Sequence, residues 1–131
     1  MNFKTKIIKI EGKNLEGFFQ NLVTNDIQLL KNNQALYSAM LSPQGKFLVD
    51  FIILNDENFF LIETNSTSVE DIINLISKYD LRKSLIISIA KDINTLCILY
   101  NDLPTYIKTD LAKYNIVKNK NFLIFSDPRK S

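Results

Sequence analysis

Short runs rich in branched and aromatic residues recur along the chain, several of them alternating with polar positions, and they predict β-strands. Strands are expected at residues 3–10, 35–41, 46–54, 59–64, 85–89, 93–100 and 122–125. Apolar residues follow helical spacing instead at residues 15–22 and 69–79. Three strands followed by a helix and a further strand predict an α+β fold, an antiparallel sheet of strands with helices packed on one face.

A β-hairpin is predicted where the strands at 35–41 and 46–54 flank Ser42-Pro43-Gln44-Gly45. Proline suits the second position of a turn, and glycine tolerates a positive φ. With the turn centred on its two middle residues, Tyr37 is expected nearly opposite Asp50 on the partner strand.

Asp50 is a single carboxylate inside an apolar strand, where an unpaired charge is costly to bury. Because side chains alternate along a strand, Asp50 is expected to share a face with Ile52, and Val49 and Phe51 belong to the other face. Two interpretations remain open. Either Asp50 bonds only to backbone groups and Tyr37 belongs to the core, or both side chains face a ligand.

The segment Thr24-Asn25-Asp26 follows the first predicted helix. Its side chains are of the types that bond to nearby backbone amides. We expect them to cap and position the chain rather than to contact a ligand, with a further turn at residues 27–30.

Composition indicates one globular domain, since 46% of the 131 residues are apolar and 23% are charged. The net charge of +2 is too slight to suggest nucleic acid or a membrane surface as a partner. No apolar run approaches the roughly 18 residues that suggest a membrane-spanning helix. Lysines interrupt the first apolar residues, so no leader pattern is recognised and a cytoplasmic location is expected.

Catalysis by the common nucleophile–base pairs is not expected, because the chain has no histidine. Histidine is also the commonest metal ligand, and no metal site is predicted. The single Cys97 cannot form an internal disulfide. Its apolar neighbours at 95–100 favour a buried strand thiol over a nucleophile.

Four segments stand out by their order and intervals. They are FFQNLVTND at 18–26, ALYSAML at 35–41, PQGKFLVDFII at 43–53 and Asp127-Pro128-Arg129. Together they resemble the amino-terminal part of the folate-binding aminomethyltransferase superfamily, which includes the glycine-cleavage T-protein and the YgfZ-type proteins. The resemblance implies a partial folate-binding domain over 1–131, in which 1–33 and 92–131 belong to one subdomain and 34–91 to the other.

The resemblance also implies a cofactor, tetrahydrofolate, and a site around Asp50, which matches an aspartate central to folate binding and one-carbon transfer. Tyr37 matches a tyrosine of the folate site, and Asn65 matches a later asparagine when a one-residue gap is allowed. Ile52 completes the candidate site because it shares the expected face of Asp50. Aromatic and aliphatic side chains can hold a flat pterin ring while a carboxylate accepts hydrogen bonds from its nitrogens.

Three functions are compatible with this resemblance. The first is a folate-binding protein of the YgfZ type that supports iron–sulfur cluster assembly or repair, because Val49 stands where the T-protein pattern has a second acid. The K-G-C-x-x-G-Q-E signature of YgfZ-type chains is, however, not in the sequence. The second function is an aminomethyltransferase of glycine cleavage. The third is a remnant or assembly domain that binds no folate, in which a second chain or a homo-oligomer completes the fold.

Overall fold

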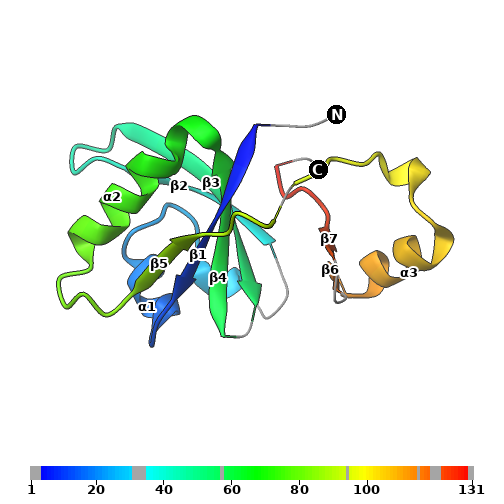
Figure 1. The fold of residues 1–131 in the computed structure, drawn as a ribbon, viewed down its shortest axis with the longest axis horizontal. Coiled ribbons are helices and arrows are strands. Elements are labelled where there is room, and N and C mark those ends of the chain that lie inside the picture. The colour runs from blue at the N-terminus through cyan, green and yellow to red at the C-terminus, as the bar shows by residue number, and fades with distance from the viewer. Residues whose placement is uncertain are drawn as a thin grey trace.

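A five-stranded antiparallel sheet organises the computed structural model, which describes residues 4–30, 35–56, 58–93, 95–114, 116–118 and 122–129. Its strands stand in the order β2-β3-β4-β1-β5 (Figure 1). They are β1 (Thr5–Glu11), β2 (Ala35–Leu41), β3 (Phe47–Asp56), β4 (Phe59–Asn65) and β5 (Ile86–Ile89). The sheet therefore joins β1, which comes from the first 33 residues, to strands that all come from residues 34–91.

Two helices, α1 (Leu15–Gln20) and α2 (Val69–Tyr79), pack on one face of this sheet and form the main core with it. Phe19 of α1 and Ile72 and Ile76 of α2 are fully buried there. Burial of an apolar side chain of this size contributes roughly 1.5–3 kcal/mol relative to exposure. The predicted α+β class, with helices on one face of an antiparallel sheet, is confirmed.

Polar side chains mark where these helices begin and end. Asn14 caps α1, because its side chain accepts a hydrogen bond from the Gly17 amide at 3.3 Å. Asp80 follows α2, and its carboxylate accepts hydrogen bonds from the amides of Ser84 at 3.1 Å and Leu85 at 3.0 Å. These bonds satisfy backbone donors of the loop and lead the chain from α2 into β5.

The opposite face of the sheet carries a smaller apolar cluster. Its buried members are Ile7, Ile52, Leu54 and Leu61. Leu123 and Phe125 pack against this cluster from β7 (Leu123–Phe125), which pairs with β6 (Ile116–Lys118) in a two-stranded sheet. This small sheet follows α3 (Thr105–Tyr114), and Figure 1 shows the three elements beside the main sheet. The end of the chain thus contributes to the second face.

The prediction of a strand at residues 93–100 is wrong. Its described residues form no strand, and a 3₁₀ turn begins at Tyr100. Leu96 is 59% exposed and Ile98 is 48% exposed. Cys97 is also exposed, so the expectation of a buried strand thiol is wrong as well. An apolar run becomes a strand only when a neighbouring strand pairs with it, and none of the described residues does so here.

The helix α3 was not predicted, because the segment after Pro104 is mostly polar. Ile107 and Leu111, which are 3% and 7% exposed, form its buried face. They stand four residues apart and follow a proline next to the helix start, which is the weak signal available. None of the helices in the described ranges is long and apolar enough to cross a membrane.

Candidate functional site

The hairpin between β2 and β3 is built as the sequence predicts. The amide of Gly45 donates to the Ser42 carbonyl at 2.9 Å, and the Ser42 amide donates to the Lys46 carbonyl at 2.8 Å. Gly45 has φ 84°, a conformation that glycine adopts without the steric cost of a Cβ atom. The turn therefore fixes how β2 and β3 pair.

The register of this hairpin corrects the predicted position of Tyr37. Tyr37 lies opposite Ile52, and Asp50 lies opposite Ala39. A shift in the pairing between Met40 and Leu41 accounts for part of the difference. The displacement is two residues, and a displacement of two keeps every side chain on its face. Tyr37, Asp50 and Ile52 consequently share the face opposite α1 and α2.

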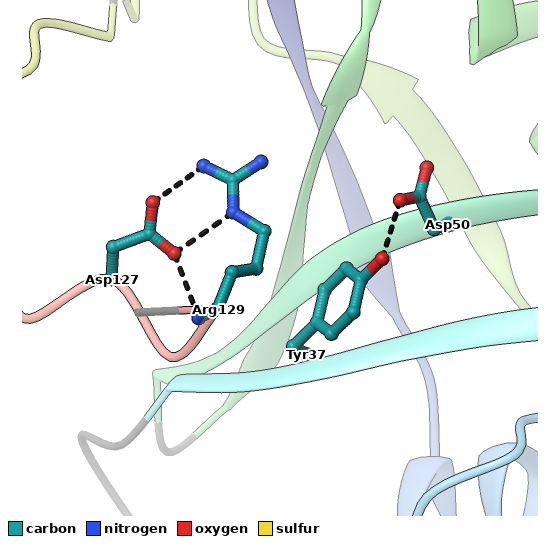
Figure 2. A network of polar contacts seen from close by, with 4 residues as sticks. All are labelled: Tyr37, Asp50, Asp127 and Arg129. Carbon is teal, nitrogen blue, oxygen red and sulfur yellow. Dashed lines mark hydrogen bonds and ion pairs between the residues drawn. The ribbon is translucent and has the colours of Figure 1, made fainter. Parts of the chain in front are cut away.

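Tyr37 and Asp50 form a hydrogen-bonded pair across neighbouring strands (Figure 2). The Tyr37 hydroxyl donates to Asp50 Oδ2 at 2.5 Å. Both side chains are exposed, Tyr37 by 36%. The hydrogen bond to Asp50 raises the pKa of the Tyr37 phenol, and burial and the negative charge of Asp50 act in the same direction. Asp50 is therefore a partnered surface carboxylate, and Tyr37 is not a core residue.

The remaining candidate residues lie on the same face. One row across the sheet reads Tyr37, Ile52, Glu63 and Ile7, from β2 to β1. Asn65 is two residues beyond Glu63 on β4 and so belongs to this face too. The structure thus brings together Tyr37, Asp50, Ile52 and Asn65. Ile52 is only 2% exposed, whereas Tyr37 and Asp50 reach the surface.

Asn65 has a local structural task as well. Its Oδ1 accepts hydrogen bonds from the Thr67 amide at 3.0 Å and the Thr67 hydroxyl at 2.9 Å. Asn65 thereby caps the 3₁₀ turn at Ser66–Ser68 that leads into α2. These bonds use its carbonyl oxygen, and the side-chain amide nitrogen makes no hydrogen bond with the described residues.

Asp127-Pro128-Arg129 forms a compact turn that presents a guanidinium beside this face (Figure 2). Asp127 Oδ1 accepts from the Arg129 amide at 2.9 Å and from Nε at 2.8 Å, and Oδ2 accepts from Nη2 at 2.6 Å. This two-pronged geometry holds the guanidinium in a fixed orientation. The hydrogen bonds that Arg129 donates to Asp127 raise the pKa of Arg129, and the negative charges of Asp127, Glu63 and Asp50 raise it further.

Glu63 is a second acid of this face that sequence reasoning missed. It is 8% exposed and makes no hydrogen bond with the described residues. Burial raises the pKa of its carboxyl, the positive charge of Arg129 lowers it, and the charge of Asp127 raises it. The available signal was the period of two along the strand, which places Glu63 on the face of Asn65.

The segment Thr24-Asn25-Asp26, which follows α1, is hydrogen-bonded to β2. Thr24 exchanges two hydrogen bonds with Ala39, one from its amide to the Ala39 carbonyl at 2.9 Å and one from the Ala39 amide to Oγ1 at 3.1 Å. Asn25 Nδ2 donates to the Tyr37 carbonyl at 2.9 Å, and the Asp26 carboxylate caps the following 3₁₀ turn. The expected capping and positioning contacts are confirmed.

The fold and the candidate site are those of an α+β domain that carries an exposed aromatic ring beside a carboxylate on one face of its sheet. The family follows from comparison with known proteins. A family model described as the GCVT N-terminal domain matches residues 4–99. The chain belongs to this family, and it corresponds to an amino-terminal part of the folate-related aminomethyltransferase superfamily.

Individual relatives agree with this assignment. An aminomethyltransferase from Bacillus pumilus is 27% identical over 120 residues, covering 91% of this chain and 33% of that protein. One from Alkaliphilus oremlandii is 38% identical over 66 residues, covering 49% of this chain and 18% of that protein. The crystal structure of glycine cleavage system aminomethyltransferase T from Bartonella henselae has the same fold, with a TM-score of 0.59 and 23% identity over 66% of this chain and 24% of that chain. The chain thus spans about a third or less of these relatives.

Proposed function

We propose that the chain binds tetrahydrofolate on the sheet face that carries Tyr37 and Asp50. The observation that carries this proposal is the hydrogen bond between these two exposed side chains, because it orients a carboxylate next to an aromatic ring. A binding site for a pterin needs both: a face for the flat ring and an acceptor for its N–H groups. The family assignment supports the same ligand.

The side chains present fit the chemistry of a reduced folate. Tetrahydrofolate carries N–H donors on its pterin ring, and the Asp50 carboxylate keeps acceptor capacity beyond the bond from Tyr37. Asn65 adds an amide nitrogen and Arg129 a cation close to the same face. When bound, the cofactor supplies a carrier for one-carbon units, while these side chains bind and orient it.

We further propose that the chain is of the YgfZ type and supports iron–sulfur cluster assembly or repair. The supporting residue is Val49, which is 3% exposed in the core beneath the helices. The T-protein pattern, as the resemblance implies, has an acid at this position. A hairpin strand in which Asp50 follows Val49 rather than a second acid supports folate binding more directly than transfer of an aminomethyl group.

An aminomethyltransferase is the alternative function, and the names of the curated relatives favour it. The two functions are separated by supplying tetrahydrofolate and an aminomethyl donor of the glycine cleavage system to the purified protein. Formation of methylenetetrahydrofolate above the rate without protein supports the transferase. Folate binding without product supports the YgfZ-type function.

Calorimetric titration of the purified 131-residue chain with tetrahydrofolate and with 5-formyltetrahydrofolate tests the shared claim of folate binding. We expect saturable binding with one site per chain. Circular dichroism of the same sample confirms that the protein is folded. A folded protein that binds neither compound contradicts the proposal and favours the remnant or assembly domain.

A further inference from the structure

One edge of the main sheet is open. Within the described part of the chain, β5 stands last in the strand order and pairs only with β1, whereas the outer edge of β2 is hydrogen-bonded to residues 23–25. Edge strands are usually guarded by a charge, a proline or a bulge. The sequence of β5 is Ile-Ile-Ser-Ile and its pairing with β1 is regular, so β5 carries none of these guards. Ile86 and Ile89 are exposed there, and β5 presents an apolar edge that can accept a further strand.

The chain also contains an apolar segment that pairs with none of the described strands. This segment, residues 95–99, is called the arm. Its residues Leu96, Cys97, Ile98 and Leu99 are all exposed, and they belong to neither apolar cluster of the sheet. Leu99 has extended backbone angles, φ −66° and ψ 137°. An uncharged apolar run with an extended backbone is the kind of segment that adds to a sheet edge.

The path of the chain keeps the arm away from its own β5 edge. After β5, the Ala90 amide donates to the Ile7 carbonyl at 2.9 Å, and the Ala90 side chain packs against the smaller apolar cluster. The Ile93 amide then donates to the Ala90 carbonyl at 3.3 Å and closes a turn. The chain crosses β1 and continues toward α3, so β5 and the arm lie on different sides of β1 (Figure 1). Both segments therefore remain available to a second chain.

The charges beside the two segments have opposite signs. Arg82 and Lys91 flank β5, whereas Asp92 and Asp102 flank the arm. All four side chains are exposed, and none of them forms an ion pair with another described residue. An arm laid along the β5 edge of a second copy brings an acid near a base at each end, whichever way the strand runs. Complementary charges of this kind steer association and disfavour wrong partners.

We propose that the arm of one chain adds as a strand to β5 of a second copy, which returns its own arm to the first. Because each chain supplies both an edge and an arm, the exchange closes about a twofold axis and stops at a dimer. Backbone hydrogen bonds between arm and β5 supply affinity, and apolar side chains exposed in the single chain become buried. Tyr37 and Asp50 belong to β2 and β3, at the other end of the strand order, so the dimer leaves them accessible.

Sedimentation equilibrium of the 131-residue chain over a range of concentrations measures the dimer directly. We expect a reversible monomer–dimer equilibrium in the wild type. Leu96→Lys places a charge in the arm and should raise the dissociation constant of the dimer about tenfold or more. Leu29→Lys is the matched control, because Leu29 is 58% exposed and Leu96 is 59% exposed, but Leu29 lies in the 3₁₀ turn after α1. The control should dimerise like the wild type, and circular dichroism should show the same fold in all three proteins.

An exchange of charges tests which segments meet. One variant carries Arg82→Glu and Lys91→Glu, so that acids flank both its β5 edge and its arm. The other carries Asp92→Lys and Asp102→Lys, so that bases flank both. Each variant alone should dimerise about tenfold or more weakly than the wild type, because like charges face each other. An equimolar mixture should recover the dimer, since each arm then meets an edge of opposite charge.

Three results would overturn the exchange of arms. A folded wild-type chain that stays monomeric at all concentrations shows that the arm and the β5 edge do not bind each other, and leaves both to a different polypeptide. A dimer that Leu96→Lys does not weaken uses another surface. Charge variants that fail to recover a dimer on mixing, or a wild type that forms assemblies larger than a dimer, rule out reciprocal pairing. None of these results bears on the binding of tetrahydrofolate, which is measured separately.

Discussion

The Tyr37 hydroxyl bonds to the Asp50 carboxylate across two neighbouring strands, although the two residues are not paired in the sheet. Tyr37 lies opposite Ile52, and the bond reaches diagonally to the residue two positions back along β3. A tyrosine is long enough to span this diagonal. The pair therefore depends on the register of the hairpin, and it links the geometry of the turn to the chemistry of the face.

The first prediction concerns the ionisation of Tyr37. The hydrogen bond to Asp50, together with burial and the charge of Asp50, raises the pKa of the phenol. Asp50→Asn removes the charge and should lower this pKa toward the ordinary value for tyrosine. Ultraviolet absorbance titration measures it, with Tyr37→Phe subtracted to isolate this tyrosine from the other four. An identical Tyr37 titration in the wild type and in Asp50→Asn would show that the bond does not form in solution.

The second prediction concerns stability and pH. Burial raises the pKa of Glu63 in the folded chain above its ordinary value of 4.5. At pH values between the ordinary pKa and the raised pKa, the folded chain therefore binds more protons than the unfolded chain. The free energy of unfolding should therefore fall as pH rises through this window. A tenfold difference in proton affinity corresponds to about 1.4 kcal/mol. Denaturant unfolding at a series of pH values should show this fall in the wild type and in Glu70→Gln, which changes an exposed acid of α2, but not in Glu63→Gln. Equal slopes in all three proteins argue against a perturbed Glu63.

The third prediction concerns the hairpin turn. Gly45 has φ 84°, and no atom outside Gly45 and its two chain neighbours lies within 4 Å of the position that a Cβ would occupy. Gly45→Ala should therefore destabilise the protein through backbone strain alone, by about 1 kcal/mol. Gly45→Asn should cost less, because asparagine tolerates this conformation. Urea unfolding of the three proteins measures the difference, and a larger loss for asparagine than for alanine contradicts this account.

The fourth prediction concerns Asn25, a positioning residue. Its side chain donates to the backbone carbonyl of Tyr37 and so holds β2 where the ring meets Asp50. Asn25→Ala should cost about 1 kcal/mol in stability and weaken tetrahydrofolate binding without removing any proposed ligand contact. Asn21→Ala is the matched control, since the side chain of Asn21, the residue after α1, donates to the Gly17 carbonyl of that helix and not to β2. Equal affinities in Asn25→Ala and Asn21→Ala argue against the positioning role.

Much of the fold follows from local pattern. The turn at residues 42–45 and the strands on either side are set by proline, glycine and neighbouring apolar runs, which act over a few residues. The same rules predict the shared face of Asp50 and Ile52. These rules cannot predict the register in which β2 pairs with β3. That register shifts between Met40 and Leu41, and the shift depends on how both strands pack in the rest of the sheet.

The errors of prediction come from tertiary context. Residues 93–100 have the composition of a strand, but the described residues offer no strand edge with which they pair. Ile107 and Leu111 are buried in a helix whose other residues are mostly polar, so its periodicity is weak. Glu63 was missed because the sequence does not show which acids become buried. Burial depends on neighbours that are distant in the chain.

The central claim, folate binding through Asp50, is tested most directly by calorimetric titration of tetrahydrofolate into the wild type, Asp50→Asn and Asp71→Asn. Asp71 is an exposed acid on α2, which covers the opposite face of the sheet, so Asp71→Asn makes the same chemical change away from the site. We predict equal affinities for the wild type and Asp71→Asn, and an affinity at least about tenfold lower for folded Asp50→Asn. Equal binding by all three proteins would place the ligand elsewhere and contradict the account.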